Sequence, residues 1–163
     1  MIWLPTRLDR LSFTTAADLE AAAWAIFQKD FSAFPPFRTE DVRVIRAPHK
    51  ARADQGHTYW HMVTEGEREE TRGKSISDRL ERVPWARPVI ENEADVGSAM
   101  KVWSNQRSGN THVCIWFDRQ NYLVVLKQCA DHYLLKTTYC PESWRRQQLH
   151  REYTAWKKNG ARL

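Results

Sequence analysis

The chain lacks any long hydrophobic run, and no hydrophobic segment of a signal peptide follows Met1. These absences argue against a membrane-spanning or secreted protein and lead us to expect a cytoplasmic one. Its three cysteines, Cys114, Cys129 and Cys140, are odd in number and show no close pairing. A disulfide framework is therefore not expected, and Cys114, within an apolar strand pattern, should be a buried free thiol.

The chain also lacks the short motifs of several enzyme classes. It has no Gly-x-Ser-x-Gly elbow, no Walker loop, no Gly-x-Gly-x-x-Gly and no Cys-x-x-Cys. His57 and His61 lie four residues apart, and on the strand predicted there they would be roughly 13 Å apart. We therefore expect no cofactor and no metal. The leading alternative is metal-independent RNA cleavage, because it needs only a proton acceptor, a proton donor and cations.

Length and charge favour one domain with a basic end. At 163 residues the chain can bury a sizeable core, so a single domain, 1–163, is expected. Lys and Arg (25) exceed Asp and Glu (20), and the excess gathers after Tyr139. The cations there are Arg145, Arg146, Arg151, Lys157, Lys158 and Arg162. A basic terminus suits nucleic-acid or acidic protein partners.

The first half of the chain predicts helical and extended segments in turn. An N-terminal arm, 1–13, has no clear period, and a helix then begins at Thr14 or Thr15 and stops near Phe31. Alternating and β-branched residues predict a hairpin of two strands, 42–46 and 57–64. An exposed charged loop, 65–74, and a short helix capped by Ser77, 77–83, are expected to follow.

The second half predicts a meander closed by a helix. Its strands are expected at 100–103, 111–117, 122–128 and 132–139. The strand from Tyr122 is apolar at every position to Leu126, so both its faces should be covered. A basic helix, 141–158, then carries an apolar stripe of Leu149, Tyr153 and Trp156. The whole order predicts an α+β domain, with an antiparallel sheet of four to six strands between an N-terminal and a basic C-terminal helix.

Three groups of polar residues suit RNA cleavage. His61 ends an aromatic segment before a charged loop, so its imidazole could transfer protons near neutral pH. Arg79 and Arg82, three residues apart on a short helix, could clamp one phosphate. On strand 132–139, alternation places Lys136 and Thr138 on one face and Thr137 and Tyr139 on the other, and the pattern does not decide which pair faces a site.

Several short segments together carry a resemblance to a known family. They are Asp30-Phe31, Tyr59-Trp60-His61, Arg79 to Arg82 with Trp85, and Leu135-Lys136-Thr137-Thr138-Tyr139. From about Ala17 to Lys157 the chain resembles the phage- and prophage-associated branch of the barnase–EndoU–colicin–RelE-like nuclease superfamily. The resemblance implies a small α+β ribonuclease that is often a toxin, with metal-independent chemistry that leaves cyclic phosphate ends. It implies roles for His61, for Arg79 or Arg82, and for Lys136, Thr137 and Tyr139, with Thr138 as a second hydroxyl.

The leading hypothesis is therefore a toxin-like endoribonuclease with RNA as substrate and an antitoxin or immunity protein as a possible partner. The expected catalytic residues are His61, Arg79, Arg82, Lys136, Thr137, Thr138 and Tyr139, and the expected RNA-binding residues are Trp85, Trp103, Arg145, Arg146, Arg151, Lys157 and Lys158. The alternative is a non-catalytic module of phage or prophage origin that binds nucleic acid or a partner protein. A third possibility is a phage structural or regulatory protein. Convergence of His61, Arg79, Lys136 and Thr137 in one cleft would favour catalysis.

Overall fold

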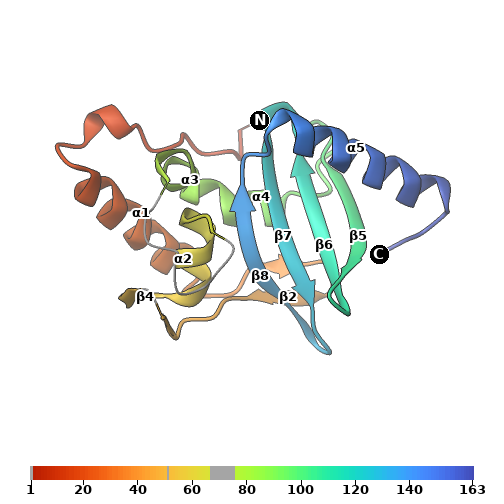
Figure 1. Ribbon diagram of the computed structural model, residues 1–163, viewed down its shortest axis with the longest axis horizontal. Helices are drawn as coiled ribbons and strands as arrows, with labels where there is room; N and C mark the ends of the chain where they lie inside the picture. The colour runs from red at the N-terminus through yellow and green to blue at the C-terminus, as the bar shows by residue number, and fades with distance from the viewer. Residues whose placement is uncertain (1, 51, 67–75) are drawn as a thin grey trace.

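The computed structural model of the protein describes residues 2–50, 52–66 and 76–163 (Figure 1). Its helices and 3-10 turns (η) are η1 (Arg10–Ser12), α1 (Ala16–Asp30), α2 (His57–Val63), α3 (Ser77–Glu81), η3 (Val83–Trp85), α4 (Ala86–Glu91), η4 (Asp118–Gln120) and α5 (Ser143–Lys158). Its strands are β1 (Pro36–Phe37), β2 (Glu40–Arg43), β3 (Pro48–His49), β4 (Arg52–Gly56), β5 (Lys101–Arg107), β6 (Asn110–Phe117), β7 (Tyr122–Gln128) and β8 (His132–Tyr139). This content confirms the α+β class. Within the described residues, no helix is long and apolar enough to cross a membrane.

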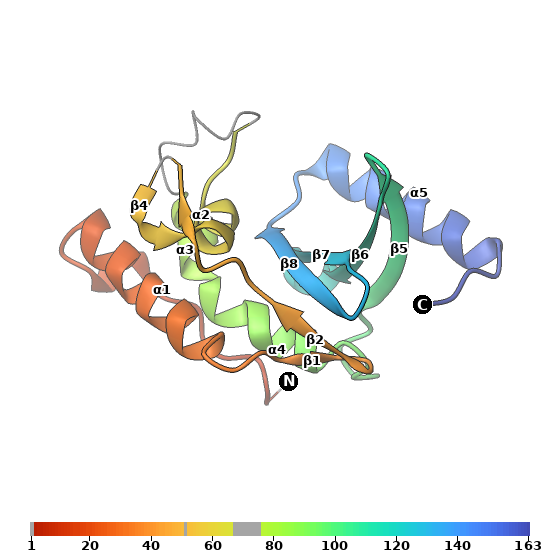
Figure 2. The ribbon, with the colours of Figure 1, turned by 90° about the horizontal axis from the view of Figure 1, so that it is seen from below.

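Within the described residues, six strands form one curled sheet in the order β1-β2-β8-β7-β6-β5 (Figures 1 and 2). Strands β5 to β8 make the predicted antiparallel meander, and β7 and β8 have the predicted bounds. Strand β2, however, pairs with β8 in parallel, so the sheet is mixed and the prediction of a wholly antiparallel sheet is wrong. The long connection from β2 to β8 leaves strand direction open, whereas a tight hairpin would fix it.

Segment 57–64, predicted as a strand, is the helix α2 instead. Its β-branched and aromatic residues face the core: Thr58, Tyr59, Trp60, Met62 and Val63 are buried. His57 and His61 are the less buried positions, and their spacing of four residues is a helical period. Tertiary packing thus overrides local β propensity here. The predicted hairpin with 42–46 does not form, because β2 pairs with β1 and β8.

The start of α2 is fixed by hydrogen bonds to the segment before β3. The N–H groups of His57 and Thr58 donate to the carbonyls of Ala47 and Ile45, at 2.8 and 3.2 Å. The Ile45 N–H in turn donates to the Thr58 hydroxyl at 2.8 Å. Gly56 lies at this crossing, where an added Cβ would lie 3.3 Å from the carbonyl oxygens of Ile45 and Arg46, a tight contact that needs a small shift of the backbone.

Both faces of the sheet are covered, as the continuous apolar run from Tyr122 to Leu126 predicts. One face packs against α1 to α4 through a core that includes Leu19, Phe27, Trp60, Ile90 and, from β7, Val124. The opposite face packs against α5 through a smaller cluster of Trp103, Cys114, Trp116, Leu123 and Leu149. Helix α1 begins at the predicted capping box of Thr15 and Asp18, which confirms its start. Helices α1, α2 and α3 lie on the side of the sheet where β8 is found. Helix α5 lies across the opposite face (Figures 1 and 2).

The region before α4 differs in detail from the prediction. Of the predicted loop 65–74, residues 67–74 lie outside the described residues. The predicted short helix is α3 followed by η3. Ser77 is its first residue rather than its cap, because Ile76 occupies the N-cap position without a side-chain hydrogen bond.

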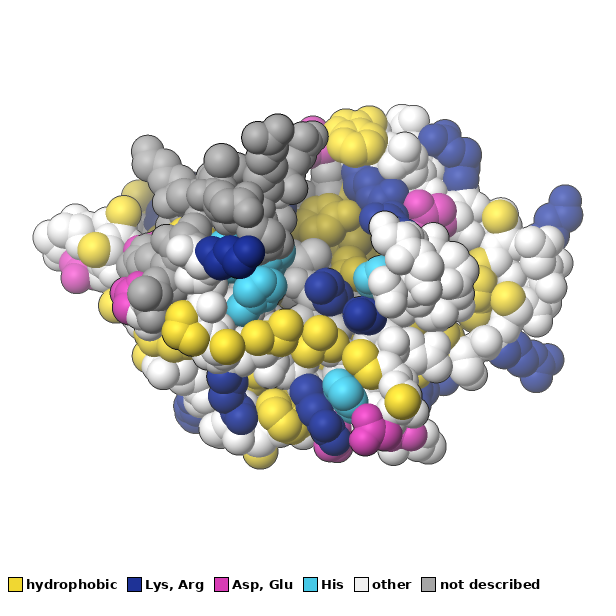
Figure 3. Space-filling model, turned by 60° about the horizontal axis from the view of Figure 1, so that its bottom comes forward, with side chains coloured by type: hydrophobic (Ala, Val, Ile, Leu, Met, Phe, Trp, Pro, Cys, Tyr) yellow, Lys and Arg dark blue, Asp and Glu magenta, His cyan; other side chains and the backbone are white. Residues whose placement is uncertain are grey.

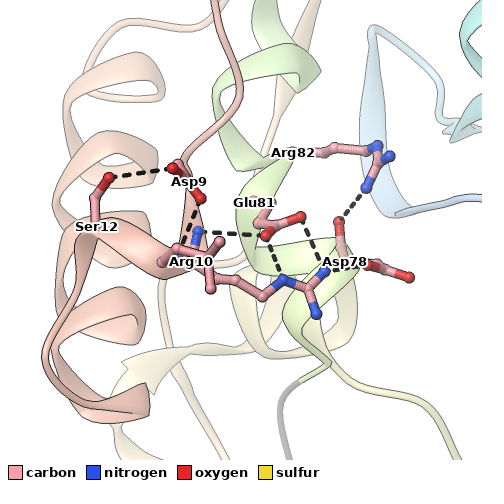
Figure 4. Close-up of polar contacts among 7 residues, drawn as sticks. Asp9, Arg10, Ser12, Asp78, Glu81 and Arg82 are labelled. Atoms are coloured by element: carbon pink, nitrogen blue, oxygen red, sulfur yellow. Dashed lines mark hydrogen bonds and ion pairs between the residues drawn. The ribbon is translucent and has the colours of Figure 1, made fainter.

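The N-terminal arm is held on this region by ion pairs (Figure 4). Arg10 donates to Glu81 at 2.5 Å and also pairs with Asp78, both on α3. Its hydrogen bond lowers the pKa of the nearly buried Glu81 carboxyl. The indole of Trp85 donates to the Pro5 carbonyl at 2.8 Å. The arm is therefore part of the folded domain.

Helix α5 is held on the sheet by its predicted apolar stripe and by charge. Leu149 is fully buried, and Tyr153 and Trp156 pack against the same cluster. Asp118, in η4, accepts hydrogen bonds from Lys101 of β5 at 2.8 Å and from Arg146 of α5 at 3.1 Å. The helix begins at Ser143, two residues later than predicted.

Leu149→Ala should lower the free energy of unfolding by about 2–5 kcal/mol, because it opens a cavity under α5. Leu11→Ala is the matched control, since Leu11 is 88% exposed and its loss should cost less than about 0.5 kcal/mol. Urea unfolding followed by tryptophan fluorescence measures both. Equal effects of the two substitutions would contradict the docking of α5.

Asp118→Asn should destabilise the protein by about 2 kcal/mol at about pH 7, because a carboxylate that accepts from two cations is lost. Burial alone would raise the pKa of Asp118, but the hydrogen bonds from Lys101 and Arg146 outweigh it and hold the pKa below its usual value. The stabilisation is therefore present above the pKa of the unfolded state and is lost as pH falls through the folded-state pKa. Urea unfolding at a series of pH values should show the two proteins converge in acid. A difference independent of pH would contradict this assignment.

Candidate functional site

Helix α2, strand β8 and Arg79 of α3 enclose an open hollow of about 390 Å³. Its lining residues are His61, Thr64, Glu65, Gly66, Arg79, Lys136, Thr137 and Tyr139. Figure 3 shows this face of the molecule, where histidine side chains and cationic side chains border a depression. Four predicted residues from distant parts of the chain, His61, Arg79, Lys136 and Thr137, therefore converge in one cleft.

Helix α2 is joined directly to β8 at this hollow. The Thr137 hydroxyl donates to the main-chain carbonyl of His61 at 3.1 Å. The His61 side chain is half-buried and lines the hollow. This hydrogen bond therefore fixes the position of the His61 backbone relative to the polar end of β8.

A β-bulge decides which residues of β8 face the hollow. Thr137 pairs with Val125 and Leu135 pairs with Leu126, so Lys136 is an extra residue between them. The bulge breaks the alternation of the strand, and Lys136, Thr137 and Tyr139 all line the hollow. Thr138 is only 3% exposed and does not line the hollow. Its expected catalytic role is therefore not carried into the proposal below.

The two arginines of the predicted phosphate clamp point to different places. Arg79 donates to the Thr64 carbonyl at 2.6 Å, and its guanidinium lies 5.5 Å from the centre of the Tyr139 ring. Arg82 follows the end of α3 and donates to the Asp78 carbonyl (Figure 4). Its guanidinium lies over the Trp85 ring, 5.4 Å from the ring centre. Arg82 lines neither this hollow nor its neighbour, so the structure brings Arg79 but not Arg82 to the candidate site.

A second hollow of about 460 Å³ adjoins the first. The two share the lining residues Glu65, Arg79 and Tyr139, and the second adds Ile76, Asp78, Cys140, Glu142, Trp144 and Arg145. Arg145 donates to the Tyr139 phenol oxygen at 3.2 Å and pairs with Glu152. Burial alone would lower the pKa of Arg145, but these two partners outweigh it and raise the pKa. Arg145 therefore stays charged beside the site.

The other cations predicted to bind RNA lie away from these hollows. Arg146 pairs with Asp118, and Lys157 lies 5.8 Å from the centre of the Tyr153 ring. Arg151 and Lys158 are exposed and line a shallow, separate hollow on α5. Of the five predicted cations of α5, Arg145 is thus the one that reaches the candidate site.

The exposed aromatic residue of the site is Trp144 rather than the predicted tryptophans. Trp85 is 6% exposed and Trp103 is fully buried, so neither can stack on a base. Trp144 is 61% exposed and lines the second hollow. The sequence contained a signal for it: Trp144 lies five residues before Leu149, about 140° around the helix from the apolar stripe.

Three histidines, His49, His57 and His61, lie close together beside the hollow. A strand at 57–64, as predicted, would have kept His57 and His61 apart. The rings of His57 and His61 stack with their centres 4.6 Å apart. His49, from β3, lies 5.0 Å from His57 and 5.4 Å from His61 between ring centres. The predicted separation of His57 and His61 is wrong because the segment is helical. The distance argument against a metal site at these histidines therefore fails.

The cysteines do not contribute a nucleophile to this site. All three are free, and Cys114 is buried as predicted. Burial raises the pKa of the Cys114 thiol to about 12. Cys140 lines the second hollow, but burial raises the pKa of its thiol as well. Thiolate chemistry is therefore disfavoured.

No protein-family model, no curated protein and no solved structure matches the chain. The structure assigns the protein to the α+β class and to no narrower family. The resemblance to the nuclease superfamily stays a prediction.

Proposed function

We propose that the protein is a metal-independent endoribonuclease. The observation that carries the proposal is that His61, Arg79, Lys136, Thr137 and Tyr139 line one open hollow although they come from three elements. Packing alone does not call for this set around an accessible space. Two cations beside an imidazole are the groups that phosphodiester cleavage without a metal requires.

The chemistry follows from the lining residues. The 2'-hydroxyl of the substrate attacks the adjacent phosphorus, the bond to the 5'-oxygen breaks, and a cyclic phosphate remains. His61 and Glu65 are the groups of the hollow that can take the proton from the 2'-hydroxyl and return one to the 5'-oxygen. Arg79 and Lys136 balance the charge that develops on the phosphoryl oxygens.

Tyr139 and Thr137 position these groups. The Tyr139 oxygen already accepts from Arg145, so its O–H can donate towards a phosphate in the hollow. The Thr137 hydroxyl is engaged with the His61 carbonyl and therefore holds the helix rather than the substrate. Arg79, anchored at the Thr64 carbonyl, lies over the Tyr139 ring and keeps its charge at the boundary of both hollows.

The biological setting of the proposal rests on the family resemblance. It implies a phage-associated toxin that acts on RNA in the cytoplasm and is held in check by an antitoxin or immunity protein. The alternative of a non-catalytic module uses the same cations to bind nucleic acid. It predicts salt-dependent binding without strand scission.

Purified protein should cleave RNA in the presence of EDTA, and His61→Ala should reduce the rate by about 10²–10⁴-fold, because a proton-transfer group is removed. His132→Ala is the matched control, since His132 pairs with Asp131 in the β7–β8 turn and lies outside both hollows. Gel analysis of a labelled oligoribonucleotide measures the rates and the cyclic phosphate ends.

Equal rates for wild type and the folded His61→Ala variant would remove His61 from the mechanism. Binding of RNA by the wild type without cleavage would favour the non-catalytic module instead. Circular dichroism of each variant separates loss of chemistry from loss of fold.

Trp144→Ala should weaken binding of single-stranded RNA by about 1–3 kcal/mol, or roughly 5–150-fold, because a base can stack on this exposed indole beside the second hollow. Trp144→Phe is the control, since it keeps an aromatic face and should retain most of the affinity. Fluorescence anisotropy of a labelled oligonucleotide measures both. Unchanged affinity of the alanine variant would exclude stacking at this position.

A further inference from the structure

Three imidazoles from two elements meet beside the proposed RNA site. His57 and His61 lie on α2, and His49 lies on β3. A donor nitrogen from each lies within 4.8 Å of the others. His49 is only 2% exposed, whereas His57 and His61 are half-buried. The cluster is thus closed on one side and accessible on the other.

The backbone holds these histidines together before any ligand binds. His57 and His61 are one helical turn apart, a spacing that places two side chains on one face of a helix. The helix start is tied to Ala47 by the His57 N–H at 2.8 Å, and His49 follows two residues later. Close packing at Gly56 keeps this crossing tight, with 3.3 Å from an added Cβ to the nearest carbonyls.

The arrangement matches the ligand chemistry of a transition metal. Two histidines at positions i and i+4 of a helix, with a third ligand from elsewhere, are a recurrent zinc arrangement. In a tetrahedral site with Zn–N bonds of about 2.0–2.1 Å, the ligand nitrogens are about 3.4 Å apart. Nitrogens within 4.8 Å reach that geometry by movements of about 1 Å, which small rotations of the imidazole rings supply.

We propose that His49, His57 and His61 bind a divalent transition metal, with Zn²⁺ as the physiological ion. Imidazole nitrogen suits zinc, copper and nickel, and all-nitrogen sites exclude Mg²⁺ and Ca²⁺, which require oxygen ligands. Within the described residues the cluster supplies three ligands. Among the described residues no fourth ligand joins the three, so these histidines leave one position of a tetrahedral ion for water or another ligand.

His61 belongs to both this cluster and the proposed RNA hollow. A metal on its imidazole occupies a nitrogen lone pair and removes it from proton transfer. Zn²⁺ therefore inhibits RNA cleavage, a consequence that rests on the proposed ribonuclease function. The bound ion and the catalytic imidazole are mutually exclusive states of one side chain.

The test of the site uses metal-free full-length protein and does not depend on activity. Calorimetric titration with Zn²⁺ should give one site per chain, and Co²⁺ should give the visible absorption bands of a four-coordinate site with three nitrogen ligands. His57→Ala should weaken binding by at least about 100-fold, because even outer-shell partners of a metal contribute about 10–100-fold. His132→Ala and His150→Ala are matched controls, since both histidines lie outside the cluster. Binding that is equal in wild type and in His57→Ala would overturn the site.

A measurement on the wild-type chain covers the case in which His57→Ala does not fold. Diethylpyrocarbonate modifies accessible histidines, and peptide mass spectrometry locates the adducts. Zn²⁺ should protect His57 and His61 but leave His132 and His150 reactive. Loss of protection at His57 and His61 would contradict the proposal.

The activity measurements separate this proposal from the ribonuclease. Zn²⁺ should inhibit wild-type cleavage, and His57→Ala, which lies outside the RNA hollow, should cleave RNA in a zinc-insensitive way. Zinc binding by a protein that cleaves no RNA would support the site and overturn the ribonuclease. RNA cleavage by a protein that binds no zinc would support the ribonuclease and overturn the zinc site. Zinc binding without inhibition of cleavage would overturn the shared role of His61.

Discussion

The contact between α2 and β8 is the constraint on which the proposed chemistry depends. The Thr137 hydroxyl holds the His61 carbonyl, so the helix cannot slide along the strand without breaking this hydrogen bond. The bulge at Lys136 turns a third polar side chain of β8 towards the same helix. At its other end, α2 is tied to Ile45 and Ala47. One short helix, fixed at both ends, therefore sets the geometry of the hollow and of the histidine cluster.

Tyr139 connects this hollow to the rest of the fold. Its ring lies under Arg79 of α3, and its hydroxyl accepts from Arg145 of α5. Arg79 belongs to the side of the sheet covered by α1 to α4, and Arg145 to the helix that covers the opposite face. A phenol between two cations therefore couples the two layers. Asp118 holds the same helix through its hydrogen bond with Arg146 at 3.1 Å and so helps to place Arg145 beside the second hollow.

The sequence predicted elements wherever one physical signal dominated. The continuous apolar run from Tyr122 and the capping residues Thr15 and Asp18 were decisive, and the elements there are confirmed. At 57–64 the aromatic and β-branched residues favoured a strand, while burial against the sheet made a helix. The bulge at Lys136 could not be predicted, because it arises from pairing between strands and not from the pattern of one strand. Convergence of the site residues could not be predicted either, because they come from α2, α3 and β8 and only the fold brings these elements together.

The error at 57–64 had the largest chemical consequence. On a strand, His57 and His61 would project from one face roughly 13 Å apart, and no ion could bridge them. On a helix the same spacing brings their rings to 4.6 Å between centres and leaves room for His49 to join. His61 then stands at the boundary between a nitrogen cluster and a cationic hollow. Because one imidazole nitrogen cannot both bind a metal and accept a proton, occupancy of the cluster determines whether the hollow can act on a phosphodiester.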